Sequence, residues 1–126
     1  MHRSRLGGVI IDCQTDNLEE AARFWGAALG LKARPSDAPE DRGYVVFEQV
    51  GDELDVEVQK VEHPSRVHLD IETDDIEAEV RRLEGLGAKR VAQIRDWSVL
   101  EAPTGQRFCV VKVQRADFAT KANRWE

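Results

Sequence analysis

The chain has 126 residues, 41% of them hydrophobic, and a formal net charge of −6, which fits one soluble domain with a single core. The negative charge argues against nucleic acid as a partner, since its phosphates would be repelled. No apolar run approaches the ~18 residues that cross a bilayer, and the one near the start is too short for a signal peptide. We therefore expect a cytoplasmic protein that binds neither membranes nor nucleic acid.

The chain begins with a predicted strand and helix. Gly7 to Thr15 alternates apolar and polar side chains, which is typical of a strand. Asp16 and Asn17 then supply a helix N-cap, and Gly30 is placed to end the helix. The apolar stripe of this helix consists of Leu18, Ala21, Ala22, Trp25 and Leu29.

Further strands follow this helix. Residues 32–42 are broken by prolines and predict a short strand that runs into an exposed loop. Residues 44–50 predict a strand, and Gly51-Asp52 predicts a hairpin turn. In the next strand, residues 54–59, Glu57 and Gln59 lie on the polar face.

The stretch from Arg66 to Val80 predicts a strand that leads directly into a helix. Residues 67, 69 and 71 are apolar, whereas His68, Asp70 and Glu72 alternate with them. We expect the helix, which follows a cap signal at residues 73–75, to cover the apolar side. The polar side, with its imidazole and two carboxylates, is then the place to look for a site.

The remaining chain predicts strands at residues 88–94, 97–100 and 108–113, with a turn at 102–105. We expect the polar tail, residues 114–126, to be partly ordered at best. Cys13 and Cys109 lie in strand-like runs without a CxxC spacing, so we expect buried free thiols, although the sequence leaves a disulfide open.

An internal repeat relates the two halves of the chain. The segment VIIDCQTDNLEEAARF aligns with VHLDIETDDIEAEVRR, which places Asp12 on Asp70 and Ile10 on His68. Each half therefore contains the order strand, helix, strand, strand, strand.

This doubled βαβββ order resembles the vicinal oxygen chelate superfamily, which includes glyoxalase I, extradiol dioxygenases and bleomycin-resistance proteins. The RFWGAALG helix, the RVHLDIET strand and the WSVLEAPTGQRFCVV ending are most similar to its bacterial glyoxalase-like domain group. The resemblance implies an α+β fold in which two βαβββ modules, about residues 6–62 and 65–113, form a curled mixed sheet. This sheet would form a cup with helices outside. A single domain would span residues 1–114, followed by a C-terminal tail at 115–126.

The resemblance also implies a metal site, with ligands from the first strand of each module and from the last strand. His68 occupies the histidine position, but an aliphatic Ile10 and a Cys109 stand where two other ligands would be. The last strand of the first module offers Glu57 or Gln59, and the sequence does not choose between them. Because His68 is the one standard ligand present, we expect no cofactor, with a divalent metal as the alternative.

The polar face of the predicted cup is expected to bind a small organic molecule. His68 is the candidate catalytic residue, with a purely structural role as the alternative. The carboxylates of Asp12, Glu57 and Asp70 are expected on the same face as His68. Two carboxylates ~4 Å apart repel by about 4 kcal/mol at an effective dielectric near 20, so a bound cation, a shared proton or a basic ligand would explain their grouping. The favoured explanation is an open face on which the charges are simply solvated. The expected ligand-binding residues are Asp12, Glu57, Gln59, Asp70, Trp97 and Cys109.

Some of these assignments compete with structural roles. Cys109 is expected to fill the core, with a soft metal ligand as the alternative. Trp97 and Phe47 either line the cup, as a stacking surface for a flat ligand, or belong to the core. His2 and His63 lie at the start of the chain and in a linker, and we assign them no role.

The leading hypothesis is a glyoxalase-like small-molecule-binding protein without the standard metal site, as a lyase-type or drug-sequestering relative. The alternative is a metal-dependent lyase or dioxygenase that uses His68 with carboxylates of Asp12, Glu57 or Asp70; a third is a domain that acts only in assembly. Because Phe24 adds apolar bulk to the first helix, and relatives of this fold commonly pair, we also expect a homodimer.

Overall fold

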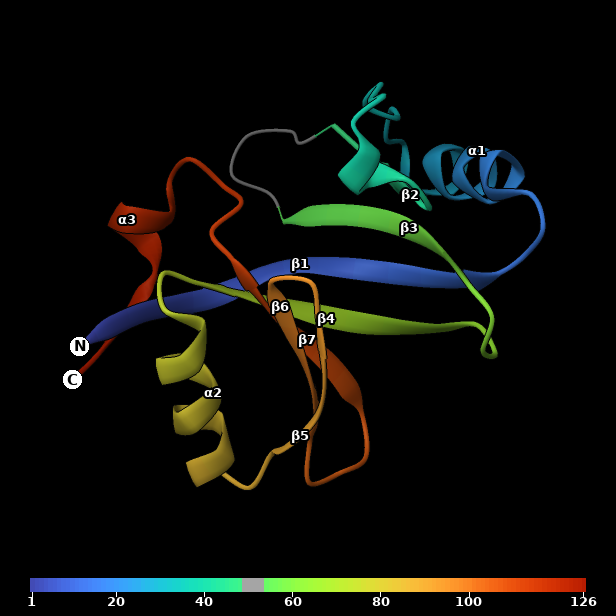
Figure 1. Cartoon of the computed structure of the whole chain (residues 1–126). Helices are drawn as coiled ribbons and strands as arrows, with labels where there is room; N and C mark the ends of the chain where they lie inside the picture. The colour runs from blue at the N-terminus through green and yellow to red at the C-terminus, as the bar shows by residue number, and fades with distance from the viewer. Residues whose placement is uncertain (49–53) are drawn as a thin grey trace. The chain divides into compact units, whose positions relative to one another are not determined.

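A computed structural model describes residues 1–48 and 54–126, so the predicted turn at Gly51-Asp52 lies outside the described residues (Figure 1). The described chain forms two compact units, residues 8–67 and residues 1–7 with 68–126. Strands pair both in parallel and antiparallel, and α-helices pack on them, which confirms the α+β class and the mixed sheet. No helix among the described residues is long and apolar enough to span a membrane.

The unit of residues 8–67 contains the first predicted module. Strand β1 (His2–Gln14) pairs in parallel with β3 (Asp55–Val61), and β3 pairs antiparallel with β2 (Tyr44–Val46). Helix α1 (Leu18–Leu29) begins at an N-cap whose Asn17 side chain accepts the N–H of Glu20, and it ends at Gly30 in the left-handed region. The short strand predicted near residue 33 is reduced to an isolated bridge between Ala33 and Phe47, and a 3-10 helix, η1 (Pro39–Asp41), follows it.

The core of this unit lies between α1 and one face of β1 and β3. Its buried members are Ile11, Cys13, Ala22, Phe47 and Val58. Phe47 is 1% exposed and belongs to this core, so of the two roles considered for it the core role is the one observed. Gly26 explains the close packing, because a Cβ there would lie 3.3 Å from the Phe47 ring and 3.0 Å from the Leu31 carbonyl oxygen.

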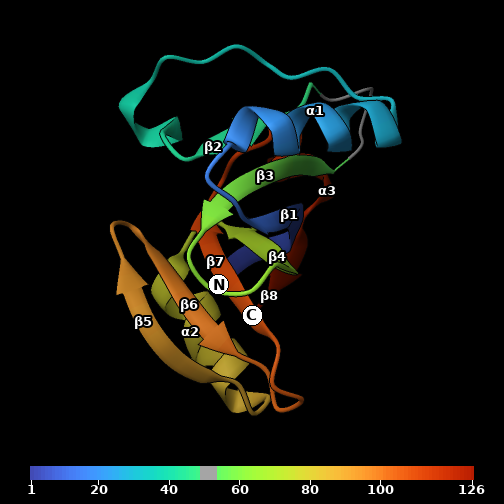
Figure 2. The ribbon, with the colours of Figure 1, turned by 90° about the vertical axis from the view of Figure 1, so that its right-hand side faces the viewer.

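The second unit contains a complete strand-helix-strand-strand-strand order (Figure 2). Strand β4 (Arg66–Thr73) pairs in parallel with β7 (Arg107–Lys112), and β6 (Trp97–Glu101) lies antiparallel between β7 and β5 (Lys89–Ile94). Helix α2 (Ile76–Gly85) begins at Asp75, whose side chain accepts the N–H of Ala78. The buried core of this unit consists of Val80, Leu83, Leu100 and Val110, with Ile71 packed against them.

The prediction that α2 covers the whole apolar side of β4 is only partly right. Ile71 packs against the α2 core, but Leu69 is 47% exposed and Val67 is 58% exposed. The helix packs against β5, β6 and β7, and so it reaches only the end of β4 nearest to it.

The prediction of a poorly ordered tail is wrong. Residues 118–121 form helix α3 (Phe118–Lys121), and β8 (Asn123–Trp125) pairs antiparallel with the start of β1. The physical reason is Glu72, which is 0% exposed and needs cationic partners. Arg5 Nε donates to its carboxylate at 2.7 Å, and Arg115 Nε lies 3.6 Å away, which ties both ends of the chain to β4.

A second buried carboxylate belongs to α2. Glu79 is 0% exposed, and its Oε1 lies 2.8 Å from Nε2 of His2, which is itself buried. Burial alone would raise the pKa of Glu79, but hydrogen bonds from Arg82, His2 and Ser4 outweigh burial and lower it. Arg82 also stacks on the Trp125 ring at 3.9 Å, so this network holds β8 in place.

Candidate functional site

Three polar side chains of different chemistry converge on one side of β4 and β7. Asp70 and Cys109 are register partners in the parallel β4–β7 pair, so their side chains project from the same side. His68 lies two residues before Asp70 and shares that side. One possible donor atom from each of the three residues lies within 4.8 Å of the others, and His68 Nε2 is 3.4 Å from Asp70 Oδ1.

This side, opposite the α2 core, is named here the His68 face. It comprises alternate residues of β4, β7, β6 and β5, because side chains of a strand alternate between the two sides of a sheet. Glu72 and Val111 are register partners at the end of β4 and β7 that lies toward Trp97, and both side chains are buried. His68 and Asp70 are more open, with side chains 12% and 16% exposed.

Asp70 carries the least satisfied group of the cluster. Its Oδ1 atom is buried and accepts no hydrogen bond within the described part of the chain. A buried acceptor without a partner costs about 1–3 kcal/mol, and more when it is charged. A proton donor or a cation held beside His68 and Asp70 would therefore bind favourably.

The donor set also fits a divalent metal. Imidazole nitrogen, carboxylate oxygen and thiolate sulfur are the usual protein ligands of zinc, and three such ligands leave a fourth position for water or substrate. Ligand atoms around a tetrahedral zinc are about 3.3–3.8 Å apart, given its bond lengths. His68 and Asp70 already meet this spacing, and the Cys109 sulfur lies within 4.8 Å of both donor atoms.

Cys109 lies outside the core that was expected to enclose it. Its side chain is half-buried on the His68 face, whereas the neighbouring Val110 fills the α2 core. Cys13 is buried in the core of the other unit, and both thiols are free, as expected. Burial, followed by the negative charge of Asp12, raises the pKa of Cys13, which makes it the less reactive type of thiol.

Asp12, Glu57 and Gln59 lie in the other unit and share one side of its sheet. Asp12 pairs with Gln59 in register, and Ile10 pairs with Glu57. Ile10 is 2% exposed, and its aliphatic side chain offers no metal ligand. Gln59 donates from Nε2 to the Tyr44 hydroxyl at 2.8 Å, which fixes the orientation of its amide.

Asp12 is a buried carboxylate at 2% exposure, in contrast to the solvated group considered from the sequence. His63 Nε2 and Arg66 Nε each lie 3.8 Å from its Oδ2 atom. His63 was given no role because it lies in a linker, and no sequence pattern connects it to a residue 51 positions away. The linker is tied to β1 because the Gln14 amide donates to the Glu62 carbonyl oxygen at 2.9 Å.

Trp97 lies on the His68 face together with residues that the sequence did not single out. Val99 pairs with Cys109 in register, and Trp97 is two residues from Val99 on the same strand. Further along the face, Arg107 Nε lies 3.4 Å from Glu101 Oε1. One end of the face therefore has apolar side chains, with the Arg95 guanidinium 6.0 Å from the centre of the Trp97 ring, and the other end has the Arg107–Glu101 ion pair.

Residues 8–111 match the family model of the glyoxalase-like domain. The chain belongs to this family. It is therefore a member of the vicinal oxygen chelate superfamily, as the repeated βαβββ order predicted. No curated protein matches the sequence of this glyoxalase-like protein.

Solved structures share the fold at low sequence identity. A methylmalonyl-CoA epimerase from Mycobacterium tuberculosis has a TM-score of 0.64 at 15% identity, over 87% of this chain and 88% of that one. A hypothetical protein from Bacillus halodurans C-125 has a TM-score of 0.62 at 13% identity, over 89% and 96%. A methylmalonyl-CoA epimerase variant from Streptomyces coelicolor, in complex with 2-nitronate-propionyl-CoA, has a TM-score of 0.60 at 14% identity, over 88% and 98%.

Proposed function

We propose that this glyoxalase-like protein binds a small organic molecule on the His68 face, as a lyase-type or ligand-sequestering member of its family. The observation that supports this most is the convergence of His68, Cys109 and Asp70, whose buried Oδ1 accepts no hydrogen bond from the residues that the structure describes. Such convergent polar groups beside apolar side chains are typical of ligand sites. Structural neighbours solved with CoA esters are consistent with a small organic ligand.

The three residues would have different roles toward a ligand. Imidazole is the commonest acid–base group in enzymes, which makes His68 the proposed acid–base group. Asp70 Oδ1 would accept a hydrogen bond from the ligand or orient the imidazole, since Nε2 lies 3.4 Å away. Cys109 would contribute a polarisable contact beside them. In the other unit, Asp12, Glu57 and Gln59 remain proposed ligand-binding residues.

A second candidate function is metal-dependent lyase or dioxygenase chemistry. The distances among the three donor atoms favour it, with His68, Asp70 and Cys109 as the ligands in place of the standard set. A divalent ion there would polarise a carbonyl or hydroxyl oxygen of the substrate. His68 would then act as a ligand, and acid–base work would fall to other groups.

Calorimetric titration with zinc and nickel separates the two candidates. The protein should be purified without a chelating tag and compared with His68→Ala and Cys109→Ser. The matched control is His63→Ala, since His63 is the half-exposed histidine of the linker. Tight binding that is lost in both cluster variants and kept in the control would favour the metal-dependent enzyme.

A fragment screen by thermal shift tests the leading proposal itself. Organic ligands that stabilise the parent and the control, but no longer stabilise His68→Ala or Asp70→Asn, would support a site on the His68 face. Ligands that stabilise all four proteins equally would contradict it. We also infer a homodimer, supported by the 62% exposure of Phe24 on α1, and separately propose a cytoplasmic location.

A further inference from the structure

The His68 face continues over β6 and β5 as an apolar surface. Ala92 pairs with Val99 in register, and Ile94 pairs with Trp97, so these four side chains lie beside one another. The opposite side of these strands contributes Leu100 to the α2 core. Ile94 is nevertheless 44% exposed, and Trp97 and Val99 are half-buried. The strands therefore have one packed side and one side with apolar groups accessible to a ligand.

The other end of the same face is charged. Arg107 and Glu101 are register partners whose side chains are 39% and 37% exposed, with Nε and Oε1 3.4 Å apart. An exposed ion pair contributes only about 0–1 kcal/mol, so it does not hold Arg107 firmly. Guanidinium has five N–H donors in a planar fork that matches a carboxylate. Arg107 thus keeps donors for an acidic group of a ligand.

The spacing of these two ends defines the ligand. Trp97 and Glu101 are four residues apart on β6, which corresponds to about 13 Å along the strand. Cys109, paired with Val99, lies midway between them. Because the long Arg107 side chain can bridge part of this distance, a molecule shorter than the span, with a flat ring on Trp97 and an acidic group near Arg107, would pass directly over the His68–Asp70–Cys109 cluster.

We infer that the ligand of the His68 face is a planar apolar molecule that carries a carboxylate or similar acidic head group, with the ring on β5–β6 and the head on Arg107. This inference rests on the proposed function, because it names the substrate class of the same site. Aromatic stacking and the burial of apolar area supply affinity at one end. A charge-assisted, two-pronged hydrogen bond supplies orientation at the other.

Binding of naphthalene-2-carboxylate to the full chain, measured by calorimetry, tests the inference. Naphthalene-2-carboxamide keeps the ring without the charge, and octanoate keeps the charge without the ring. We expect naphthalene-2-carboxylate to bind about tenfold more tightly than either analogue. The carboxamide loses a charge-assisted hydrogen bond, and octanoate loses the ring stacking. If octanoate binds as tightly as naphthalene-2-carboxylate, the ligand need not be planar and the inference is overturned. If the carboxamide binds as tightly as the carboxylate, the ligand needs no acidic group and the inference is likewise overturned.

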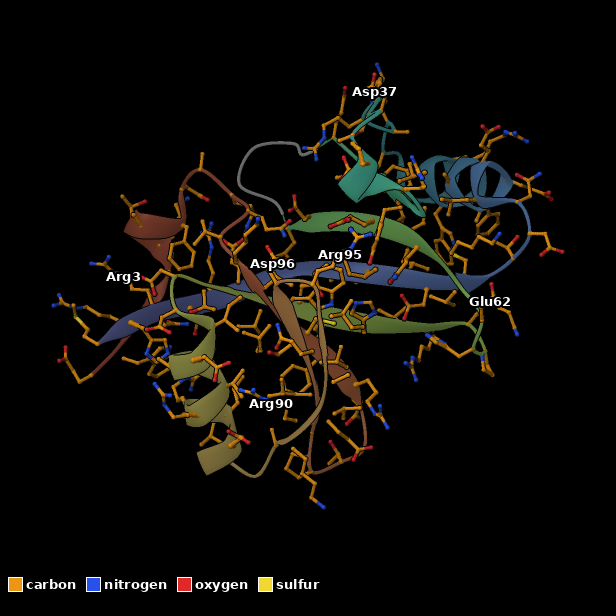
Figure 3. The ribbon with its side chains drawn as sticks, in the orientation of Figure 1. Arg3, Asp37, Glu62, Arg90, Arg95 and Asp96 are labelled. Atoms are coloured by element: carbon orange, nitrogen blue, oxygen red, sulfur yellow. The ribbon has the colours of Figure 1, made fainter. Side chains whose placement is uncertain are left out.

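Two variants locate the ends of the ligand. Arg107→Gln should weaken the carboxylate about tenfold and leave the carboxamide unchanged, whereas Trp97→Leu should weaken both about tenfold. The matched control is Arg90→Gln. Arg90, on β5, is also a half-exposed arginine, but it points to α2 and binds Glu77 at 3.0 Å (Figure 3). An Arg107→Gln protein that behaves like Arg90→Gln would overturn the inference.

The same titrations separate failure of this inference from failure of the proposed function. Fragments that depend on His68 and Asp70, combined with no binding of naphthalene-2-carboxylate at millimolar concentration, would overturn the substrate class and leave the site intact. Binding of naphthalene-2-carboxylate that is unchanged in both His68→Ala and Trp97→Leu would overturn both, because the molecule would then bind elsewhere.

Discussion

Replacing Arg5 with alanine should destabilise the unit of residues 1–7 and 68–126 by about 2–4 kcal/mol. Arg5 Nε donates to fully buried Glu72 at 2.7 Å, and its Nη2 donates to Asp117 at 2.6 Å. Removal of one partner of a buried ion pair costs about 3–5 kcal/mol, because the other charge stays buried without compensation. Arg115 at 3.6 Å and the Gln114 N–H at 3.2 Å remain, and they reduce the loss.

Urea unfolding followed by far-ultraviolet circular dichroism measures this loss, provided that the unfolding free energy has the same dependence on urea concentration in the parent and the variants. Arg5→Lys keeps the charge without the two-pronged geometry and should fall between the parent and Arg5→Ala. Arg90→Ala is the control, because its ion pair with Glu77 is exposed and contributes about 0–1 kcal/mol. A loss in Arg5→Ala that is within about 0.5 kcal/mol of this control would show that the network does not hold the two ends of the chain.

Further measurements follow from other contacts. The lowered pKa of Glu79 means that its stabilising contribution is complete above the ordinary carboxyl pKa of 4.5 and is lost as pH falls through the lower folded value. Acid unfolding of Glu79→Gln should therefore be shallower than that of the parent, and a parallel curve would contradict the assignment. Gly26→Ala should cost about 1–3 kcal/mol by overpacking against the Phe47 ring, whereas Gly85→Ala, with open space around it, should be neutral or stabilising in thermal unfolding. Sedimentation should find a dimer that Phe24→Ser weakens, and a monomer at high micromolar concentration would count decisively against pairing.

Local patterns in the sequence were sufficient for the elements and for the fold class. The alternation at residues 66–72 predicted β4, and the cap signals at residues 16–17 and 73–75 predicted where both helices begin, with Asn17 and Asp75 as the observed caps. These features depend on residues within a few positions of one another, so the sequence expresses them directly. The repeat then led to the correct family, because it preserves the order of elements.

The candidate site was predicted only in part, for a reason that lies in strand register. His68 and Asp70 share a strand, so their grouping followed from alternation alone. Cys109 meets them because β7 pairs in parallel with β4 and places it opposite Asp70. Arg107, Glu101 and Ile94 join the same face through two further pairings. Register between distant strands is set by packing of the whole sheet, which no local pattern contains.

The sequence by itself determined which segments form helices and strands and which family the chain belongs to, since these follow from periodicity and from the order of elements. Only the tertiary structure decided the environment of each polar group. Glu72 has the same alternation as His68 and Asp70, yet it is fully buried because Arg5 and Arg115 reach it from opposite ends of the chain. Burial of a charge depends on partners brought together by folding, and so the tail and its carboxylate could be understood only in three dimensions.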